Sequence, residues 1–450
     1  MSIDKPTRRQ VLCGGLLTAL LGVTAVDSMA ALRHVVINTD TRNESQNALV
    51  VLFLRGGADG LNIIAPYGDE DYFRLRPSLA LASPTNKSTP AAARLLDLDG
   101  FFGMHPALLP LLPLYHSGTF LPIHAVGSFD HSLSHFQAMA AMERGLPEDG
   151  GDIASGWLAR YLNSATAVDR SPLRSVALSA TLPDSLRGAT GAVALTRLSQ
   201  FQLSVPTGVG GQQHHSDERE EAMAQTLQRL YGQVGSSAQS RSEDLSTVCN
   251  DTLRAMKAVQ RLDSDHYMPA VGATYPNTGL AVALKQAACM VKGRVGLEAA
   301  CINVEGWDTH VAQGSDTGWQ ASRLADLGGS IAAFMTDLGS NSEHVTVVIM
   351  TEFGRRAYEN TGLGTDHGSA SVMMLLGGGV KGGRVLADWP GLASHQLVGP
   401  GNLHVTTDYR DVLAEVLASR MNVANAASLF PGLRRKDVGA LQIINPVATA

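Results

Sequence analysis

The residues best suited to chemistry lie in one stretch, where an apolar run of strand length is followed by acidic side chains and an imidazole. The run 345–351 ends on Glu352, and a polar, glycine-containing loop then carries Asp366 and His367. Carboxylate oxygens and imidazole nitrogens, without a thiolate, suit divalent ions such as zinc, manganese or magnesium. The stretch therefore predicts a buried strand that presents metal ligands at its carboxyl end.

Two further apolar runs end in residues of the same kinds. The run 299–304 leads into Asp308 and His310, which are two residues apart and project to the same side of an extended backbone. The run 47–54 ends in a glycine-rich turn that contains Asp59. Each motif alone has an ordinary explanation, a hydrogen-bonded surface pair or a turn-forming aspartate. Together they predict one site for one or two ions, because the carboxyl ends of parallel strands meet at one edge of a sheet.

A candidate nucleophile follows another predicted strand, 119–126. The next segment carries Ser132 and Ser134, each preceded or followed by a histidine, and opens into a helical pattern. A serine at a helix start is usually only an N-cap. In an α/β sheet, however, this position places the hydroxyl at the positive end of the helix, where it could attack a substrate. Ser134 with His135 is the first candidate, and Ser132 with His131 is the second.

Apolar runs that alternate with helical patterns predict an α/β protein, with a mostly parallel central sheet and helices on both faces. Two amphipathic helices, at 216–231 and 243–262, interrupt the pattern between the site motifs. We expect them to form a helical insertion or cap within about 189–265 that borders the cleft. No long linker or repeat divides the chain, so 31–450 is predicted to be a single domain.

The first 30 residues, 1–30, have the pattern of an export signal. A twin-arginine motif at 7–12 precedes an apolar run that is too short for a stable membrane span, and 28–30 resembles a small-residue cleavage site. The alternative is a chance arginine pair before an ordinary secretory signal. We expect the twin-arginine translocase to export the folded protein, which is then periplasmic or secreted.

Charge and cysteine usage exclude several classes of protein. The formal net charge is −6 and no basic run is interleaved with aromatic residues, so a nucleic-acid partner is not supported. The four cysteines include no C-x-x-C pair, which excludes a zinc ribbon and a disulfide framework. The absence of a haem-binding C-x-x-C-H and of a dinucleotide-binding glycine motif argues against an oxidoreductase.

Several short motifs occur in a distinctive order along the chain. They are L-R-G-G-A-D-G-L-N, S-H-F, G-W-D-T-H, T-E-F-G-R-R and G-T-D-H-G, followed by L-G-G-G-V-K-G-G and T-D-Y-R. In this order they resemble the exported domain-of-unknown-function 1501 family, over nearly the whole chain after the signal. That family looks like a distant branch of the alkaline phosphatase and sulfatase superfamily. The resemblance implies an alkaline-phosphatase-like fold with a two-metal centre.

The resemblance also implies roles for individual residues. The implied metal ligands are Asp59, Asp308, His310, Glu352, His367 and Asp366. Phe353 stands where the superfamily has a histidine, so one imidazole of a two-metal centre is missing. Ser134 would be the nucleophile, and Arg55, Arg355 or Arg356 would bind the oxyanion of the substrate. Secondary candidates for the site are Ser132, His135, Asn62 and Arg355.

The implied function is metal-dependent hydrolysis of a phosphate or sulfate ester, in a small molecule or a polymer. A metal ion would activate the hydroxyl of Ser134, or a bound water, and would stabilise charge on the transferred group. The alternative is a non-catalytic periplasmic binding or assembly protein that uses a degenerate hydrolase fold. The reaction class rests on analogy between folds and is therefore a hypothesis.

Overall fold

The computed structural model describes residues 47–129, 132–147, 153–164, 171–201, 216–232, 239–433 and 441–445. The predicted signal segment, 1–30, and the predicted partner His131 lie outside these ranges. No helix within the described ranges is long and apolar enough to span a bilayer.

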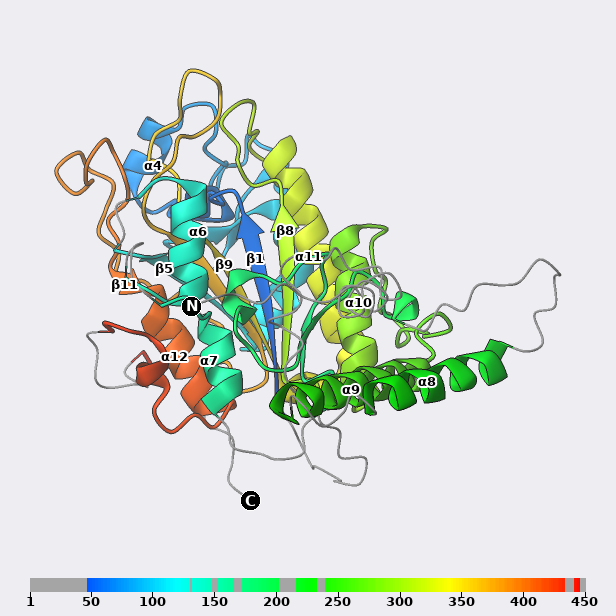
Figure 1. Ribbon diagram of the computed structural model, residues 1–450. Coiled ribbons are helices and arrows are strands. Elements are labelled where there is room, and N and C mark those ends of the chain that lie inside the picture. Colours follow the sequence, from blue (N-terminus) through cyan, green and yellow to red (C-terminus); the bar gives the residue numbers. More distant parts are fainter. Residues whose placement is uncertain are drawn as a thin grey trace.

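An eight-stranded sheet forms the centre of the protein, in the order β11-β5-β10-β9-β1-β8-β6-β7 (Figure 1). Within it β10 runs antiparallel to its two neighbours, whereas the other pairings are parallel. The prediction of an α/β fold with a mostly parallel sheet is therefore confirmed. The strands are β1 (Ala48–Arg55), β5 (Phe120–Gly127), β6 (Ser175–Ala177), β7 (Ala192–Ala194), β8 (Ala299–Glu305), β9 (Val345–Thr351), β10 (Ser371–Gly377) and β11 (Thr407–Asp408).

Helices cover both faces of the sheet, which explains why the strands are continuous apolar runs. Alternate residues of β1 point to opposite faces. Val50 and Leu52 share a core with α10 (Gly279–Lys292) and α11 (Trp319–Leu338). On the other face, Val51 and Phe53 share a second core with α7 (Trp157–Ser164) and α12 (Tyr409–Arg420).

The sheet topology brings the predicted site motifs to one edge. The parallel register pairs Arg55 of β1 with Glu305 of β8, and Leu54 with Thr351 of β9, so these three strands end side by side. Because β10 is antiparallel, it begins at the same edge, where Ser371 pairs with the end of β5. The helix α6 (His135–Arg144) follows β5. Polar residues from five segments can therefore meet at this edge.

Two long helices occupy the region expected to be an insertion. They are α8 (Ser216–Gly232) and α9 (Gln239–Leu262), which pack on one another through Leu227 and Leu253. The end of α9 lies against the end of α10, before the amino end of β8. The contact is so close that a Cβ atom at Gly293 would lie 2.1 Å from Leu262 Cδ2. Figure 1 likewise shows both helices at the end of the sheet where β1 begins. The two helices therefore lie away from the site edge, rather than bordering it as we expected.

Short elements complete the described chain. They are α3 (Gly60–Ile63), β2 (Ile64–Ala65), α4 (Glu70–Leu75), η1 (Ala91–Ala93), β3 (Leu96–Asp97), β4 (Gly103–Met104), η2 (Pro106–Leu111), α5 (Leu112–His116), η3 (Asp184–Leu186), η4 (Leu198–Gln200), η6 (Gly339–His344) and η7 (Ala426–Leu429). The strands β2, β3 and β4 form a separate small antiparallel sheet beside the main one.

A fully buried histidine in β5 is expected to make stability depend on pH. His124 donates from Nε2 to the carbonyl of Ile64 at 2.9 Å, and its Nδ1 accepts from the backbone N–H of Ala125 at 2.8 Å. Burial lowers the pKa of His124 from 6.5 to about 4. The unfolded chain therefore binds a proton at this histidine more readily than the folded protein does. Above pH 6.5 His124 is neutral in both states and does not lower the free energy of unfolding, which then decreases as the pH falls from 6.5 towards 4.

The expected size of this effect is about 3 kcal/mol of unfolding free energy between pH 7 and pH 4, from the shift in the pKa of His124. The measurement is chemical unfolding of the wild type and of His124→Gln at several pH values. Because the variant has no imidazole at this position, its stability disadvantage should shrink as the pH falls. Parallel stability curves for the two proteins would contradict the prediction.

Candidate metal centre

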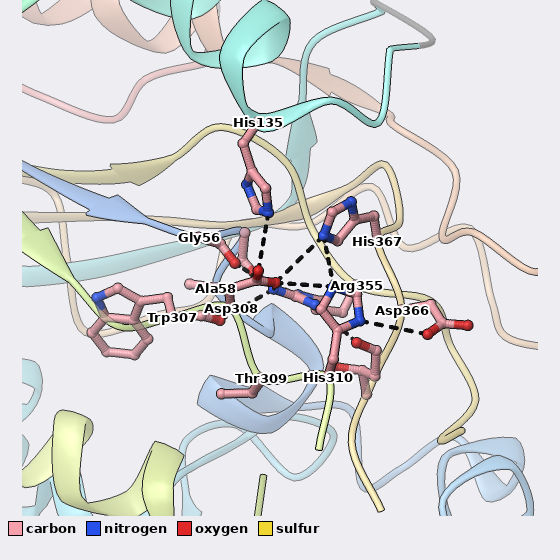
Figure 2. A network of polar contacts seen from close by, with 12 residues as sticks. Gly56, Ala58, His135, Trp307, Asp308, Thr309, His310, Arg355, Asp366 and His367 are labelled. Carbon is pink, nitrogen blue, oxygen red and sulfur yellow. Dashed lines mark hydrogen bonds and ion pairs between the residues drawn. The ribbon is translucent and has the colours of Figure 1, made fainter. Parts of the chain in front are cut away.

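Three side chains from separate elements converge at the carboxyl edge of the sheet (Figure 2). His135 is the first residue of α6, Asp308 follows β8, and His367 precedes β10. Their potential ligand atoms all lie within 4.8 Å of one another. Oδ2 of Asp308 is 3.4 Å from Nε2 of His135, and Oδ1 of Asp308 is 3.4 Å from Nε2 of His367. We call these three residues the metal triad.

A fourth side chain, His310, borders the metal triad. Its Nε2 lies 2.9 Å from Nε2 of His367 and 3.1 Å from Oδ1 of Asp308. Its Nδ1 faces Oδ1 of Asp366 at 3.6 Å. Asp366 is held in turn by Asn360 at 3.0 Å. The structure therefore places His310 beside the triad and Asp366 behind His310.

Hydrogen bonds on the outer side of two rings orient their inner nitrogens towards Asp308, although Nε2 of His367 also lies within hydrogen-bond distance of His310. Nδ1 of His367 lies 2.8 Å from the carbonyl of Leu133, which can only accept, so Nδ1 carries the proton. Nδ1 of His135 lies 2.8 Å from Oε1 of Glu352. Nε2 of His135 is buried and lacks a hydrogen-bond partner within the described residues. Two imidazole rings whose Nε2 atoms face one carboxylate, and whose Nδ1 atoms are held by outer hydrogen bonds, have the arrangement of ligands in a metal site.

The electrostatic surroundings shift the pKa values of the three residues in different directions. Burial lowers the pKa of His367, which keeps the ring neutral and able to bind a cation. The hydrogen bond to Glu352 raises the pKa of His135, which makes its ring a stronger base. Burial by itself raises the pKa of Asp308, but the hydrogen bond and charge of Arg355 outweigh it, so the pKa is lowered and Asp308 is ionised.

Two buried residues position the triad rather than join it. Glu352 accepts hydrogen bonds from His135, from the backbone N–H of Gly56 at 2.8 Å and from Oγ1 of Thr351 at 3.0 Å. Arg355 donates to Oδ1 of Asp308 at 2.6 Å. It also donates to the carbonyl oxygens of Gly56, Gly57, Thr365 and Trp307. Because these contacts use its donors, Arg355 fixes the carboxylate of Asp308 instead of facing a substrate.

Local backbone conformation explains how these residues approach one another. Gly56 and Gly57, at the end of β1, have φ values of 122° and 63°, which favour glycine. A Cβ at Gly56 would lie 2.5 Å from the backbone nitrogen of Asp308, and one at Gly57 would lie 2.5 Å from the Phe353 ring. Phe353 packs against His135 and His367, with ring centroids 4.9 and 4.8 Å apart. The Phe353 ring therefore forms an apolar side of the cluster beside His135 and His367.

The structure keeps two predicted residues out of the cluster. Asp59 forms a bidentate ion pair with Arg76, with N–O distances of 2.6 and 2.9 Å, and Oδ2 also accepts from Gln313 at 2.6 Å. Both partners of the pair are fully buried. Oδ1 of Asn62 accepts from Arg76 at 2.9 Å. Both oxygens of Asp59 are therefore occupied by protein donors.

The predicted nucleophiles and oxyanion-binding arginine lie around the cluster. Ser134 is the N-cap residue of α6, immediately before His135, and makes no side-chain cap hydrogen bond. Ser132 donates from Oγ to Gln137 at 2.7 Å. Arg55 instead donates to Glu143 and to Met139 Sδ, both on α6 and both at 3.0 Å. The structure thus places Ser134 next to the metal triad and turns Arg55 towards α6.

The donor set of the triad fits a divalent metal ion. The buried Nε2 of His135, which lacks a hydrogen-bond partner among the described residues, is the observation that a bound cation would explain. Two imidazoles and one carboxylate suit zinc, manganese or iron, whereas magnesium prefers oxygen ligands. His135, which the sequence indicated only as a secondary candidate beside Ser134, is therefore a central member of the site. Its position at the start of a helix that follows a strand is the sequence signal for this role.

Replacing Glu352 with glutamine is expected to weaken metal binding without removing it. The amide can still accept from Gly56, but it no longer provides the negative charge that strengthens His135 as a base. We expect metal affinity to fall about 10- to 100-fold, as is usual for loss of a residue that orients a ligand. Isothermal titration with zinc measures this. Glu343→Gln, a change outside the cluster, is the control, and equal affinities of the two variants would contradict the positioning role.

The fold and the cluster together define an α/β protein with a candidate metal centre at the carboxyl edge of a mostly parallel sheet. The family model described as "Protein of unknown function (DUF1501)" matches residues 121–428, which is more than half of the chain. The chain therefore belongs to this family, and the resemblance drawn from its motifs is confirmed. The wider relationship to alkaline phosphatases and sulfatases stays a prediction. No curated protein matches the chain.

Proposed function

We propose that the protein is an exported, metal-dependent hydrolase of phosphate or sulfate esters, with one divalent ion held by His135, Asp308 and His367. The observation that carries the proposal is the convergence of the Nε2 atoms of His135 and His367 on the carboxylate of Asp308, while the Nδ1 atom of each ring faces an oxygen on the outer side. An open metal position next to three protein ligands is typical of catalytic sites. Zinc and manganese suit this donor set better than magnesium.

A single ion is proposed because the other strand-end carboxylates are already bound. Asp59 is neutralised by Arg76, and Glu352 accepts from His135 and from the backbone. A second ion at either residue would have to displace these hydrogen bonds. The alternative of a two-metal centre is therefore less favourable for the arrangement of the described residues.

Several residues of the chain would have separate roles in hydrolysis. When bound, a divalent ion supplies Lewis acidity and lowers the pKa of a water or hydroxyl. Arg355 holds the Asp308 carboxylate, and Phe353 closes one side of the site with an apolar ring. Ser134, at the amino end of α6, is the proposed nucleophile, with a bound water as the alternative. The backbone N–H groups of the first turn of α6 would favour a negatively charged substrate.

Turnover and metal content of the purified mature protein test the proposal. We expect about one metal ion per chain and chelator-sensitive hydrolysis of 4-nitrophenyl phosphate or 4-nitrophenyl sulfate. Ser134→Ala should abolish turnover if the hydroxyl attacks, and should leave it largely intact if water attacks. Metal-free protein with undiminished turnover would refute the proposal.

The second candidate function is a non-catalytic binding protein on the same fold, and one observation favours it. Two of the arginines expected to bind an oxyanion already have protein partners. Arg55 pairs with Glu143, whereas Arg355 pairs with Asp308 and donates to four backbone carbonyl oxygens. Metal binding at the triad without turnover of any ester would support this candidate. Export by the twin-arginine translocase belongs to both candidates and rests on the sequence pattern.

A further inference from the structure

Four arginines near the metal triad are each paired with one carboxylate. Arg355 pairs with Asp308 at 2.6 Å, Arg55 with Glu143 at 3.0 Å and Arg76 with Asp59 at 2.6 Å. Arg356 pairs with Asp366 at 3.2 Å, behind His310. Asn360 donates a further hydrogen bond to Asp366 at 3.0 Å. Each of these four pairs has no net formal charge.

Glu352 has a different environment. Its contacts come from Nδ1 of His135, the backbone N–H of Gly56 and the hydroxyl of Thr351. None of these three donors carries a fixed positive charge when His135 is a neutral ligand. The four pairs and Glu352 together therefore contribute a formal charge of −1. With a divalent ion on the triad, the centre has a formal charge of +1.

A centre of charge +1 is neutralised completely by a singly charged group. The cost of removing an anion from water rises with the square of its charge, whereas attraction to a fixed charge rises only linearly. A doubly charged group would leave one uncompensated negative charge in a partly buried site. The paired arginines are not free to compensate it, because their partners are the carboxylates described above.

From this charge balance, we infer that the centre selects tetrahedral oxyanion esters with a single negative charge. The class comprises sulfate monoesters and phosphate diesters, and it excludes phosphate monoesters in their doubly charged form. The inference rests on the proposed function for the site, and it narrows the substrate class. It concerns binding as well as turnover, so it can be tested without catalysis.

Three non-hydrolysable ligands of similar shape separate charge from size. Benzenesulfonate and methyl phenylphosphonate carry one negative charge, and phenylphosphonate carries two at alkaline pH. In isothermal titrations of the zinc-loaded protein, we expect each singly charged ligand to bind about tenfold more tightly, a difference of about 1.4 kcal/mol. Without zinc, the four pairs and Glu352 leave the centre with a formal charge of −1, so the zinc-free protein should bind none of the three. Tighter binding of phenylphosphonate by the loaded protein would overturn the inference.

A charge variant provides a second test. Asp366→Asn removes one negative charge behind His310 and raises the charge of the loaded centre to +2, so the preference should shift by about fivefold or more towards phenylphosphonate. Asp263→Asn, an exposed aspartate paired only with His266 on its own turn, is the matched control. Equal preferences of the two variants would overturn the charge argument.

Turnover assays distinguish failure of this inference from failure of the proposed function. The substrates are 4-nitrophenyl sulfate, ethyl 4-nitrophenyl phosphate and 4-nitrophenyl phosphate, which share a leaving group. Preference for the sulfate or for the diester identifies which singly charged ester the site takes. The best turnover with the doubly charged monoester would overturn the inference but support hydrolysis. No turnover, together with the predicted binding preference, would reject the hydrolase proposal and support the charge selection.

Discussion

His367→Ala is expected to lose the bound metal ion while the protein stays folded. In the proposed site the imidazole would provide one of the three ligand atoms, and the hydrogen bond between its Nδ1 and the carbonyl of Leu133 aims Nε2 at Asp308. Removal of a residue that merely orients a ligand lowers metal affinity about 10- to 100-fold, so loss of the ligand itself should exceed about 100-fold. The side chain is partly exposed, so a large effect on stability is not expected.

Metal content after gel filtration and zinc titration measure this effect. His395→Ala, a change of an exposed histidine outside the cluster, is the matched control and should bind zinc as the wild type does. His310→Ala provides an internal comparison, because this ring borders the triad and is more exposed than His367. A greater loss of affinity in His310→Ala than in His367→Ala would mean that the ligand set is assigned incorrectly.

The main strands were predictable because burial on both faces requires unbroken apolar runs. Val345–Thr351 and Ala48–Arg55 are examples, and their burial in the structure is complete or nearly so. The carboxyl edge could also be predicted, since parallel strands that end in polar residues place those residues together. The place of α8 and α9 could not be predicted, because an amphipathic pattern shows which face is buried but not against which end of the sheet.

The roles of individual carboxylates were harder to predict, because they depend on partners that are distant in the sequence. Glu352 follows a strand in the same way as a metal ligand would. Only the tertiary structure, in which α6 approaches this strand, shows that Oε1 of Glu352 is hydrogen-bonded to Nδ1 of His135. The pairing of Asp59 depends on Arg76, which lies in a segment without any motif. Charge partners of this kind are fixed by tertiary structure, whereas strand ends are fixed by local pattern.

Asp59→Asn is expected to destabilise the protein strongly and to leave its metal content unchanged. Asp59 and Arg76 are 1% and 0% exposed, so the change leaves the guanidinium of Arg76 buried without its counter-ion. Breaking a buried ion pair in this way costs about 3–5 kcal/mol of unfolding free energy. The sequence pattern instead predicts that Asp59 is a metal ligand, and the two roles have opposite signatures.

Unfolding in urea and zinc titration of the same variants separate these roles. The double variant Asp59→Leu with Arg76→Met removes both charges, so it should recover part of the lost stability, because replacing a buried pair by apolar side chains is often neutral. Arg74→Met, which breaks an exposed ion pair with Asp71, should leave the stability nearly unchanged. If Asp59→Asn instead retained its stability and lost a metal ion, Asp59 would be a ligand, and the single-ion centre would have to be extended to two.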